Sequence, residues 1–362
     1  MQKIWEVGSE FDWKDELVAP SVPSQWFPEN YQLFATGTSV LLSIHHHLRP
    51  NGERLRLHLP SFFCMHVANK LKNAFDLCWY RDLPTEPTPD FDTLQPSPGD
   101  LVLAVNIYGI RKADSWQEWL SKQDNIILIE DHSHDPFSSW ARQSTAHYAM
   151  ASLRKTLPIP DGAIIWSPQN LDLPQPSPNE SFGAYQKLGA MLMKRIYING
   201  INISKDAYRD LQVKGEENLS QEINASASSL TANILPYLNI LELRQKREAN
   251  IKLFISLIKN YDEVTPLFTS WHNNSVPFNT ILLCNNQENR NDLRKFLISK
   301  NIFATVHWQQ PKDGLSSNDP LAIDLSNRVL TIPSDSRYSN NDIYQIVEHI
   351  IYFYQSRKYV TI

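Results

Sequence analysis

One stretch of the sequence, residues 125–165, constrains the fold more than any other. It opens with an apolar run, residues 126–129, which predicts a buried strand of a parallel sheet. Asp131 follows this run, Lys155 comes 24 residues after Asp131, and a second apolar run occupies residues 163–166. Ligands of open α/β sheets bind beyond the carboxyl ends of the strands. We therefore expect Asp131 to lie at a ligand site.

The rest of the chain predicts a large α/β part followed by a smaller one. Apolar strand patterns alternate with helical patterns from residue 34 to 166, which is typical of a doubly wound, mostly parallel sheet with helices on both faces. From Pro277 onward the pattern changes to α+β. We predict an N-terminal arm (residues 1–30), a large domain (31–235) and a C-terminal α+β domain (236–362).

Asp131 and Lys155 suit the chemistry of pyridoxal phosphate. This cofactor needs a lysine for its Schiff base and a carboxylate that keeps its ring nitrogen protonated. Ser152, three residues before Lys155, is placed to reach the phosphate. Taken singly, the aspartate has an alternative interpretation as a turn or helix cap, and the lysine as a solvated side chain.

A second candidate element is the turn Gly37-Thr38-Ser39, which enters an apolar helix. Backbone N–H groups, the helix dipole and hydroxyl groups favour an anion such as a phosphate at such a turn. The alternative is an ordinary helix cap, because Thr and Ser are common at that position.

The stretch that begins at Glu130 resembles the DegT/DnrJ family of pyridoxal-phosphate aminotransferases. In that family a strand ends in Glu-Asp-Ala-Ala-Gln, and here the same place reads Glu-Asp-His-Ser-His. The resemblance implies fold type I, the aspartate-aminotransferase-like fold. It also implies that Asp131 pairs with the pyridine nitrogen, that His134 lies near the phenolic oxygen of the cofactor, and that Lys155 forms the Schiff base.

The same resemblance, collinear over residues 30–355, implies further site residues. Gly37, Thr38 and Ser39 would hold the phosphate. Phe62 and Phe63 are both candidates for stacking on the cofactor ring, with Phe63 preferred. On the substrate side the candidates are Asn106, Tyr108, Asn218 and His307, with Arg337 as a weaker one.

The chain also departs from the family pattern at several places. Met150 stands where the family commonly has a serine, although Ser152 restores the Ser-x-x-Lys spacing of aspartate aminotransferases. Cys64 occupies the usual place of the aromatic residue, and Asn106 replaces a histidine. Near Asn218, where the family often has an arginine for the neighbouring subunit, residues 215–220 predict a polar break between helices.

Composition and charge exclude several other classes of function. A net charge of −5 gives no basic surface for nucleic acid. No apolar run approaches the length of a membrane span, and the N-terminal residues lack the pattern of a secretory signal. The three cysteines show no metal-binding spacing, and residues 45–47, three consecutive histidines, point in different directions on a helix. We expect no metal site and a cytoplasmic location.

The resemblance implies an aminotransferase that acts on small molecules. An amino donor, expected to be glutamate, would deliver its amino group to a keto group of a nucleotide-linked sugar, in a homodimer whose active site lies at the subunit interface. One alternative is a fold-type-I enzyme that acts on a non-sugar substrate in a specialised biosynthetic pathway. The other is a homologue that binds pyridoxal phosphate without turnover.

Overall fold

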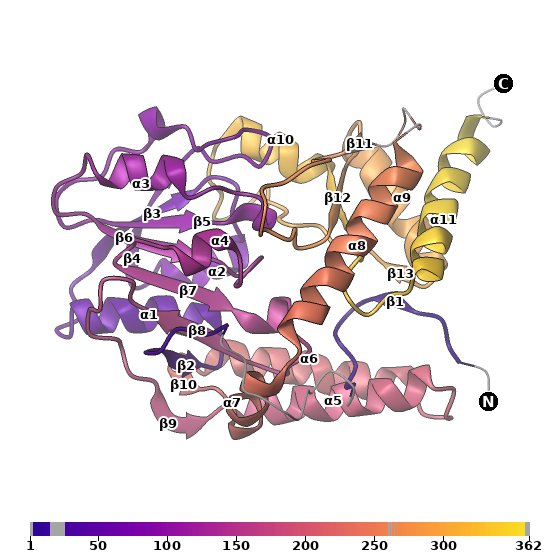
Figure 1. The fold of residues 1–362 in the computed structure, drawn as a ribbon, viewed down its shortest axis with the longest axis horizontal. Coiled ribbons are helices and arrows are strands. Elements are labelled where there is room, and N and C mark those ends of the chain that lie inside the picture. Colours follow the sequence, from indigo (N-terminus) through magenta and orange to yellow (C-terminus); the bar gives the residue numbers. More distant parts are fainter. Residues whose placement is uncertain (1–2, 15–25, 260, 262, 264, 359–362) are drawn as a thin grey trace.

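The computed structural model describes residues 3–14, 26–259, 261, 263 and 265–358. A large, mostly parallel sheet dominates the half of the molecule drawn in indigo to magenta in Figure 1. Within the described residues it has nine strands, in the spatial order β4 (Phe75–Tyr80), β3 (Leu55–Pro60), β5 (Leu101–Val105), β6 (Ile127–Asp131), β7 (Tyr148–Ser152), β8 (Ala163–Trp166), β2 (Gln32–Phe34), β10 (Ala225–Ser226) and β9 (Ser177–Glu180).

The centre of this sheet brings separate chain segments to one edge. Strands β4, β3, β5, β6 and β7 are mutually parallel, and β8 runs antiparallel between β7 and β2. In this register Asp131 pairs with Met150, while Ala163 pairs with both Ser152 and Phe34. The carboxyl ends of β6, β7 and β2 therefore lie together, as expected of a site at the end of a parallel sheet.

The helices of the large part connect and cover these strands. Their bounds are α1 (Gly37–Leu48), α2 (Met65–Leu71), α3 (Asp114–Leu120), α4 (Ser139–Arg142), α5 (Phe182–Ile198), α6 (Lys205–Gln221) and α7 (Ser229–Ile234). A continuous apolar core forms between α1, α2 and strands β3, β5 and β7 of the sheet. The short 3₁₀ turn Leu153–Lys155 follows β7 directly. The lysine therefore sits just beyond the carboxyl edge of the sheet.

The C-terminal part has its own small antiparallel sheet and helices, as the sequence pattern indicates (Figure 1). The elements are α8 (Ile240–Ile258), β11 (Thr265–Pro266), β12 (Thr280–Leu283), α9 (Gln287–Ser299), β13 (Ile302–Phe303), α10 (Pro320–Arg328), β14 (Val329–Ile332) and α11 (Asn340–Lys358). Strand β12 lies between β11 and β14. A second apolar core, formed by α8, α9, α11 and these strands, stabilises this part.

The described part of the N-terminal arm packs against the C-terminal part of the same chain. Strand β1 (Val7–Gly8) pairs in parallel with β13. Glu6 lies within ion-pair distance of Lys194 on α5 and Lys205 on α6. Residues 1–2 and 15–25 of the predicted arm lie outside the described residues.

One element prediction is wrong: residues 215–220 do not break a helix but continue α6 to Gln221. Gly215 lies where α6 crosses α5, and its carbonyl oxygen would be 2.5 Å from a Cβ atom placed on Gly183. Glycine at both positions lets the two helix backbones approach this closely, because a side chain would collide there. Figure 1 shows the two helices side by side along the lower edge of the molecule.

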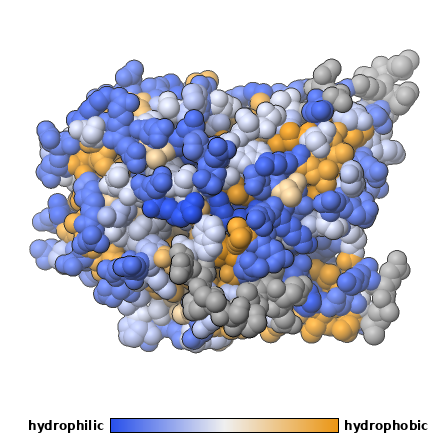
Figure 2. Space-filling model, viewed as in Figure 1, coloured by the Kyte–Doolittle hydropathy of each residue, from blue (hydrophilic) through white to orange (hydrophobic). Residues whose placement is uncertain are grey.

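The surface seen in Figure 2 is mainly hydrophilic, with hydrophobic side chains in separate patches. None of the helices in the described ranges is both long and apolar enough to span a membrane.

Candidate active site

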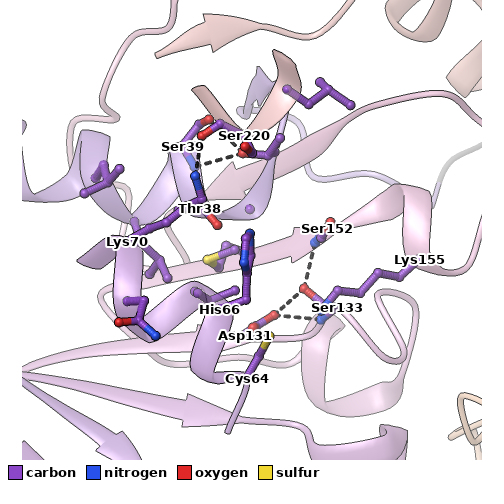
Figure 3. Close-up of a pocket in the computed structure, with 18 of the residues that line it drawn as sticks. Thr38, Ser39, Cys64, His66, Lys70, Asp131, Ser133, Ser152, Lys155 and Ser220 are labelled. Atoms are coloured by element: carbon purple, nitrogen blue, oxygen red, sulfur yellow. Dashed lines mark hydrogen bonds between the residues drawn. The ribbon is translucent and has the colours of Figure 1, made fainter. Parts of the chain in front are cut away.

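A cavity of about 570 Å³ opens at the carboxyl edge of the large sheet. On its floor, Asp131 Oδ1 accepts hydrogen bonds from the Ser133 backbone N (2.9 Å) and the Ser133 hydroxyl (2.5 Å). The same hydroxyl oxygen accepts a bond from the Ser152 backbone N at 2.8 Å. Figure 3 shows this chain of hydrogen bonds, which fixes the carboxylate against the end of β7. The second oxygen of Asp131 has no partner among the described residues.

The first turn of α1 forms the opposite wall of the cavity. Thr36 caps the helix, because its Oγ1 accepts from the Ser39 backbone N at 3.1 Å. A Cβ atom on Gly37 would lie 3.1 Å from Met150 Cε and 3.3 Å from Ser152 Cβ. Glycine therefore lets the helix start approach β7 closely. The result is an anion site of helix N–H groups beside the hydroxyls of Thr38 and Ser152.

Lys155 extends into this cavity from its 3₁₀ turn, toward the Asp131–Ser133 pair (Figure 3). The side chain is exposed and has no hydrogen bond or ion pair within the described part of the chain. Its neighbour Arg154 is held by a double hydrogen bond to Glu216 on α6, at 2.7 Å for each nitrogen. An amine in this position is free to react.

His134 is buried at the cavity wall in a stack of rings. It lies parallel to Trp308 (centroids 5.2 Å apart) and to Phe278 (4.7 Å). Its Nδ1 accepts a hydrogen bond from the Tyr108 backbone N at 2.9 Å. Burial, with the charges of Lys155 and His307 adding to it, holds the pKa of His134 well below its usual 6.5. The ring is therefore neutral, and its proton is on Nε2.

Of the two candidate aromatic residues, the structure places Phe63 in the cavity wall and Phe62 in the core behind it. Phe62 packs against Tyr108 and Trp308. Cys64 and His66 also line the cavity (Figure 3).

None of the substrate-side candidates lines this cavity. Asn106 is fully buried, and its Oδ1 accepts from the Arg111 backbone N. Tyr108 lies behind His134 and donates its hydroxyl to the His307 carbonyl oxygen at 2.7 Å. Asn218 lies on α6 and bonds to Gln186.

His307 borders a neighbouring cavity that Lys155 also lines. Its Nδ1 is 2.9 Å from the Thr331 hydroxyl oxygen. Burial and the charge of Lys155 lower the pKa of His307 to about 4. Arg337, the weaker candidate, also lines that cavity but is paired with Asp335.

Several residues at the site were not singled out from the sequence. Ser133 and Trp308 carry no motif of their own. Glu216 and Lys70 reach the cavity from helices far away in the chain, and Lys70 Nζ donates to the Ser220 carbonyl at 2.6 Å. Ser133 could have been found from the sequence, because it lies two residues beyond Asp131 at the end of a predicted strand. The positions of Trp308, Glu216 and Lys70 at the cavity depend on long-range packing.

The residues at this edge fit pyridoxal phosphate. The N-terminus of α1 and the hydroxyls of Thr38 and Ser152 face the Lys155 amine and the Asp131 carboxylate. Within the described residues, neither hydroxyl group, nor the amine, nor one of the two carboxylate oxygens has a hydrogen-bond partner. No cluster of three or more metal-ligating side chains occurs in the described ranges. A mostly parallel sheet, a cavity at its carboxyl edge and this set of side chains are together typical of fold-type-I pyridoxal-phosphate enzymes.

Comparison with known proteins supports this class. Residues 223–351 match the model of the DegT/DnrJ/EryC1/StrS aminotransferase family. This match, over the C-terminal third of the chain, confirms the predicted resemblance to that family. A comparison with curated protein sequences gives no match.

Solved structures with the same fold confirm the predicted fold class. The aminotransferase PseC of Helicobacter pylori has a TM-score of 0.63 at 13% identity, covering 97% of this chain and 100% of PseC. The PLP form of the putative sugar aminotransferase Spr1654 of Streptococcus pneumoniae has a TM-score of 0.60 at 13% identity, covering 96% and 98%. DesI, solved with its TDP-sugar product, has a TM-score of 0.57 at 13% identity, covering 89% and 80%. The PLP form of Spr1654 agrees with the predicted cofactor.

Proposed function

We propose that this chain is a pyridoxal-phosphate-dependent aminotransferase that delivers an amino group from glutamate to a keto group of a nucleotide-linked sugar. One observation carries the proposal: Lys155, Asp131 and the N-terminus of α1 converge on one cavity. The sugar substrate is supported by the similar structures, since PseC takes part in pseudoaminic acid biosynthesis and DesI has a TDP-sugar product.

Each residue of the site would have a separate role in the reaction. Bound pyridoxal phosphate would supply an electron sink for the carbon that carries the amine. Asp131 would hold the proton on the ring nitrogen through its free oxygen, as a charge-assisted hydrogen bond. Lys155 Nζ would take a proton from the substrate carbon and return it. His134 Nε2–H would donate to the phenolic oxygen, since Nδ1 is already occupied by the Tyr108 N–H.

We further propose a homodimer in the cytoplasm. The exposed apolar side chains of Phe182, Leu192 and Ile196 lie along α5, which supports a partner subunit on that helix. All three cysteines are free thiols, which supports a reducing compartment.

The test is the visible absorption spectrum of the purified protein. With pyridoxal phosphate we expect a visible band that glutamate converts to the pyridoxamine form. Lys155→Ala should abolish the band and turnover. Asp131→Asn should keep the band but slow turnover by at least 100-fold. Lys70→Ala, which removes a second lysine from the same cavity, should keep both the visible band and turnover.

Other outcomes point to the alternatives. A coloured protein that ignores glutamate but reacts with another amine would favour a different donor or a non-sugar substrate. A protein that binds the cofactor without any turnover would be a non-catalytic homologue. A Lys155→Ala variant with full activity would overturn the assignment of the lysine.

A further inference from the structure

Tyr108 lies behind the cavity wall, where the large sheet meets the C-terminal part, and it is fully buried. Its backbone N–H donates to His134 Nδ1 at 2.9 Å, and its carbonyl oxygen accepts from the Phe278 backbone N at 2.8 Å. Its hydroxyl donates to the His307 carbonyl oxygen at 2.7 Å. All three polar groups of Tyr108 therefore have partners, and two of these partners belong to the C-terminal part.

The ring of Tyr108 is held by other rings from both parts of the chain. It lies nearly parallel to Trp308, with centroids 6.2 Å apart, and to His134, at 5.9 Å. Phe62 meets its face edge-on at 6.0 Å. Trp308 comes from the C-terminal part and also stacks on His134. The orientation of the imidazole ring thus depends on a cluster that bridges the two parts.

The backbone of Tyr108 has a conformation that a tyrosine rarely adopts. Its φ of 55° and ψ of 8° lie in the left-handed region, which favours glycine. Such a conformation persists only where surrounding contacts enforce it. Here the hydroxyl and the ring of Tyr108 supply these contacts, so the C-terminal part keeps the turn after β5 in its strained form.

Relaxation of this backbone would move the N–H group that faces His134. A change in φ rotates one of the two peptide groups that flank Tyr108. The following peptide is fixed by the Phe278 N–H and by Gly109, where a Cβ atom would lie 3.0 Å from both Asp135 Cβ and the Val276 carbonyl oxygen. The preceding peptide, which carries the Tyr108 N–H, must therefore turn, and His134 Nδ1 loses its donor.

We infer that Tyr108 is a positioning residue that keeps the proton of His134 on Nε2, and that its hydroxyl and ring make this dependent on the C-terminal part. The inference rests on the proposed function, in which Nε2–H donates to the phenolic oxygen of the cofactor. A neutral imidazole whose Nδ1 has no donor can carry its proton on either nitrogen. The Nδ1–H form would present a lone pair to the cofactor where a proton is needed.

The inference is tested by NMR of the full-length, cofactor-free protein with ¹⁵N in its histidine rings. His134→Gln identifies the signals of His134 by their loss. At pH 8 we expect the wild type to carry the proton on Nε2 alone. Tyr108→Ala and Tyr108→Gly remove the same ring and hydroxyl, but only glycine adopts a positive φ without strain. Tyr108→Ala should place the proton on Nδ1 in about a fifth of the molecules or more, whereas Tyr108→Gly should keep the wild-type form.

Each outcome decides for or against the inference. The wild-type form in Tyr108→Ala would overturn it. An equal change in Tyr108→Ala and Tyr108→Gly would overturn it too, because loss of packing alone would then explain the result. If Tyr108→Ala does not fold, Tyr108→Phe decides: it loses only the bond to His307 and should still show the Nδ1–H form above the wild-type level. The expected pattern in a protein that never takes up pyridoxal phosphate would sustain the role of Tyr108 while refuting the proposed reaction.

Discussion

At the scale of single residues, Ser133 fixes the position of Asp131. Its hydroxyl donates to Asp131 and accepts from the Ser152 N–H, so that it links β6 to β7. Ser133→Ala would leave the Ser152 N–H buried without a partner, which costs about 1–3 kcal/mol. We expect a lower urea midpoint and about a tenfold weaker binding of pyridoxal phosphate, because the carboxylate loses its support.

Ser133→Thr is the control for this prediction, since it keeps the hydroxyl. It should retain most of the cofactor affinity. If Ser133→Ala binds the cofactor as tightly as the wild type, the hydrogen-bond chain has no part in holding the carboxylate.

The cofactor-side residues were the predictable part of the site. Asp131 and Ser152 end strands β6 and β7, and Lys155 lies in the turn after β7, so local pattern and chain order indicated that they would meet. Asn106 and Tyr108 also follow a strand, but the structure turns them behind the cavity wall. The sequence does not reveal this, because the direction of a side chain after a strand depends on the turn that follows; Tyr108 has a φ of 55°.

At the scale of secondary structure, the contact between α5 and α6 depends on two glycines. A Cβ atom on Gly183 would lie 2.5 Å from the Gly215 carbonyl oxygen and 2.6 Å from the Leu219 backbone N. Gly183→Ala therefore forces the helices apart, and we expect a loss of about 1–3 kcal/mol in the free energy of unfolding.

Gly189→Ala is the matched control on the same helix. Its new Cβ would meet only the end of the Leu211 side chain, at 2.9 Å. That side chain can move, and alanine favours the helix by up to about 1 kcal/mol. Thermal unfolding should show little change or a small gain. Equal destabilisation by both substitutions would contradict the account of the helix contact.

This contact also explains why the sequence was misleading here. Gly215 and the polar residues after it are typical of a break between helices, and Asn218 was expected to lie in a loop. The tertiary packing of α5 overrides that local preference. By contrast, the strands of the large sheet have continuous apolar patterns, and these predicted the fold class correctly.

At the scale of the whole molecule, the two halves of the chain meet around Lys155. His307 comes from the C-terminal part and His134 from the large sheet. Burial, with the charge of Lys155 adding to it, lowers the pKa of both. No local pattern indicates this meeting, since the three residues are far apart in the sequence. It makes the stability of the protein depend on pH.

The sign of this dependence follows from proton uptake. Unfolded histidine has a pKa near 6.5, whereas His307 in the fold has a pKa of about 4. Between these values the unfolded chain binds more protons, so the stabilising effect is complete above pH 6.5 and is lost as the pH falls toward 4. For the cofactor-free protein we expect the free energy of unfolding to fall by an amount on the order of 2 kcal/mol between pH 7 and pH 5, measured by urea unfolding.

The control is His307→Gln, which should lose less stability over the same range, because glutamine takes up no proton there. The range stays above pH 5 so that protonation of carboxylates contributes little. The same slope in both proteins would show that His307 is not buried beside the charge of Lys155.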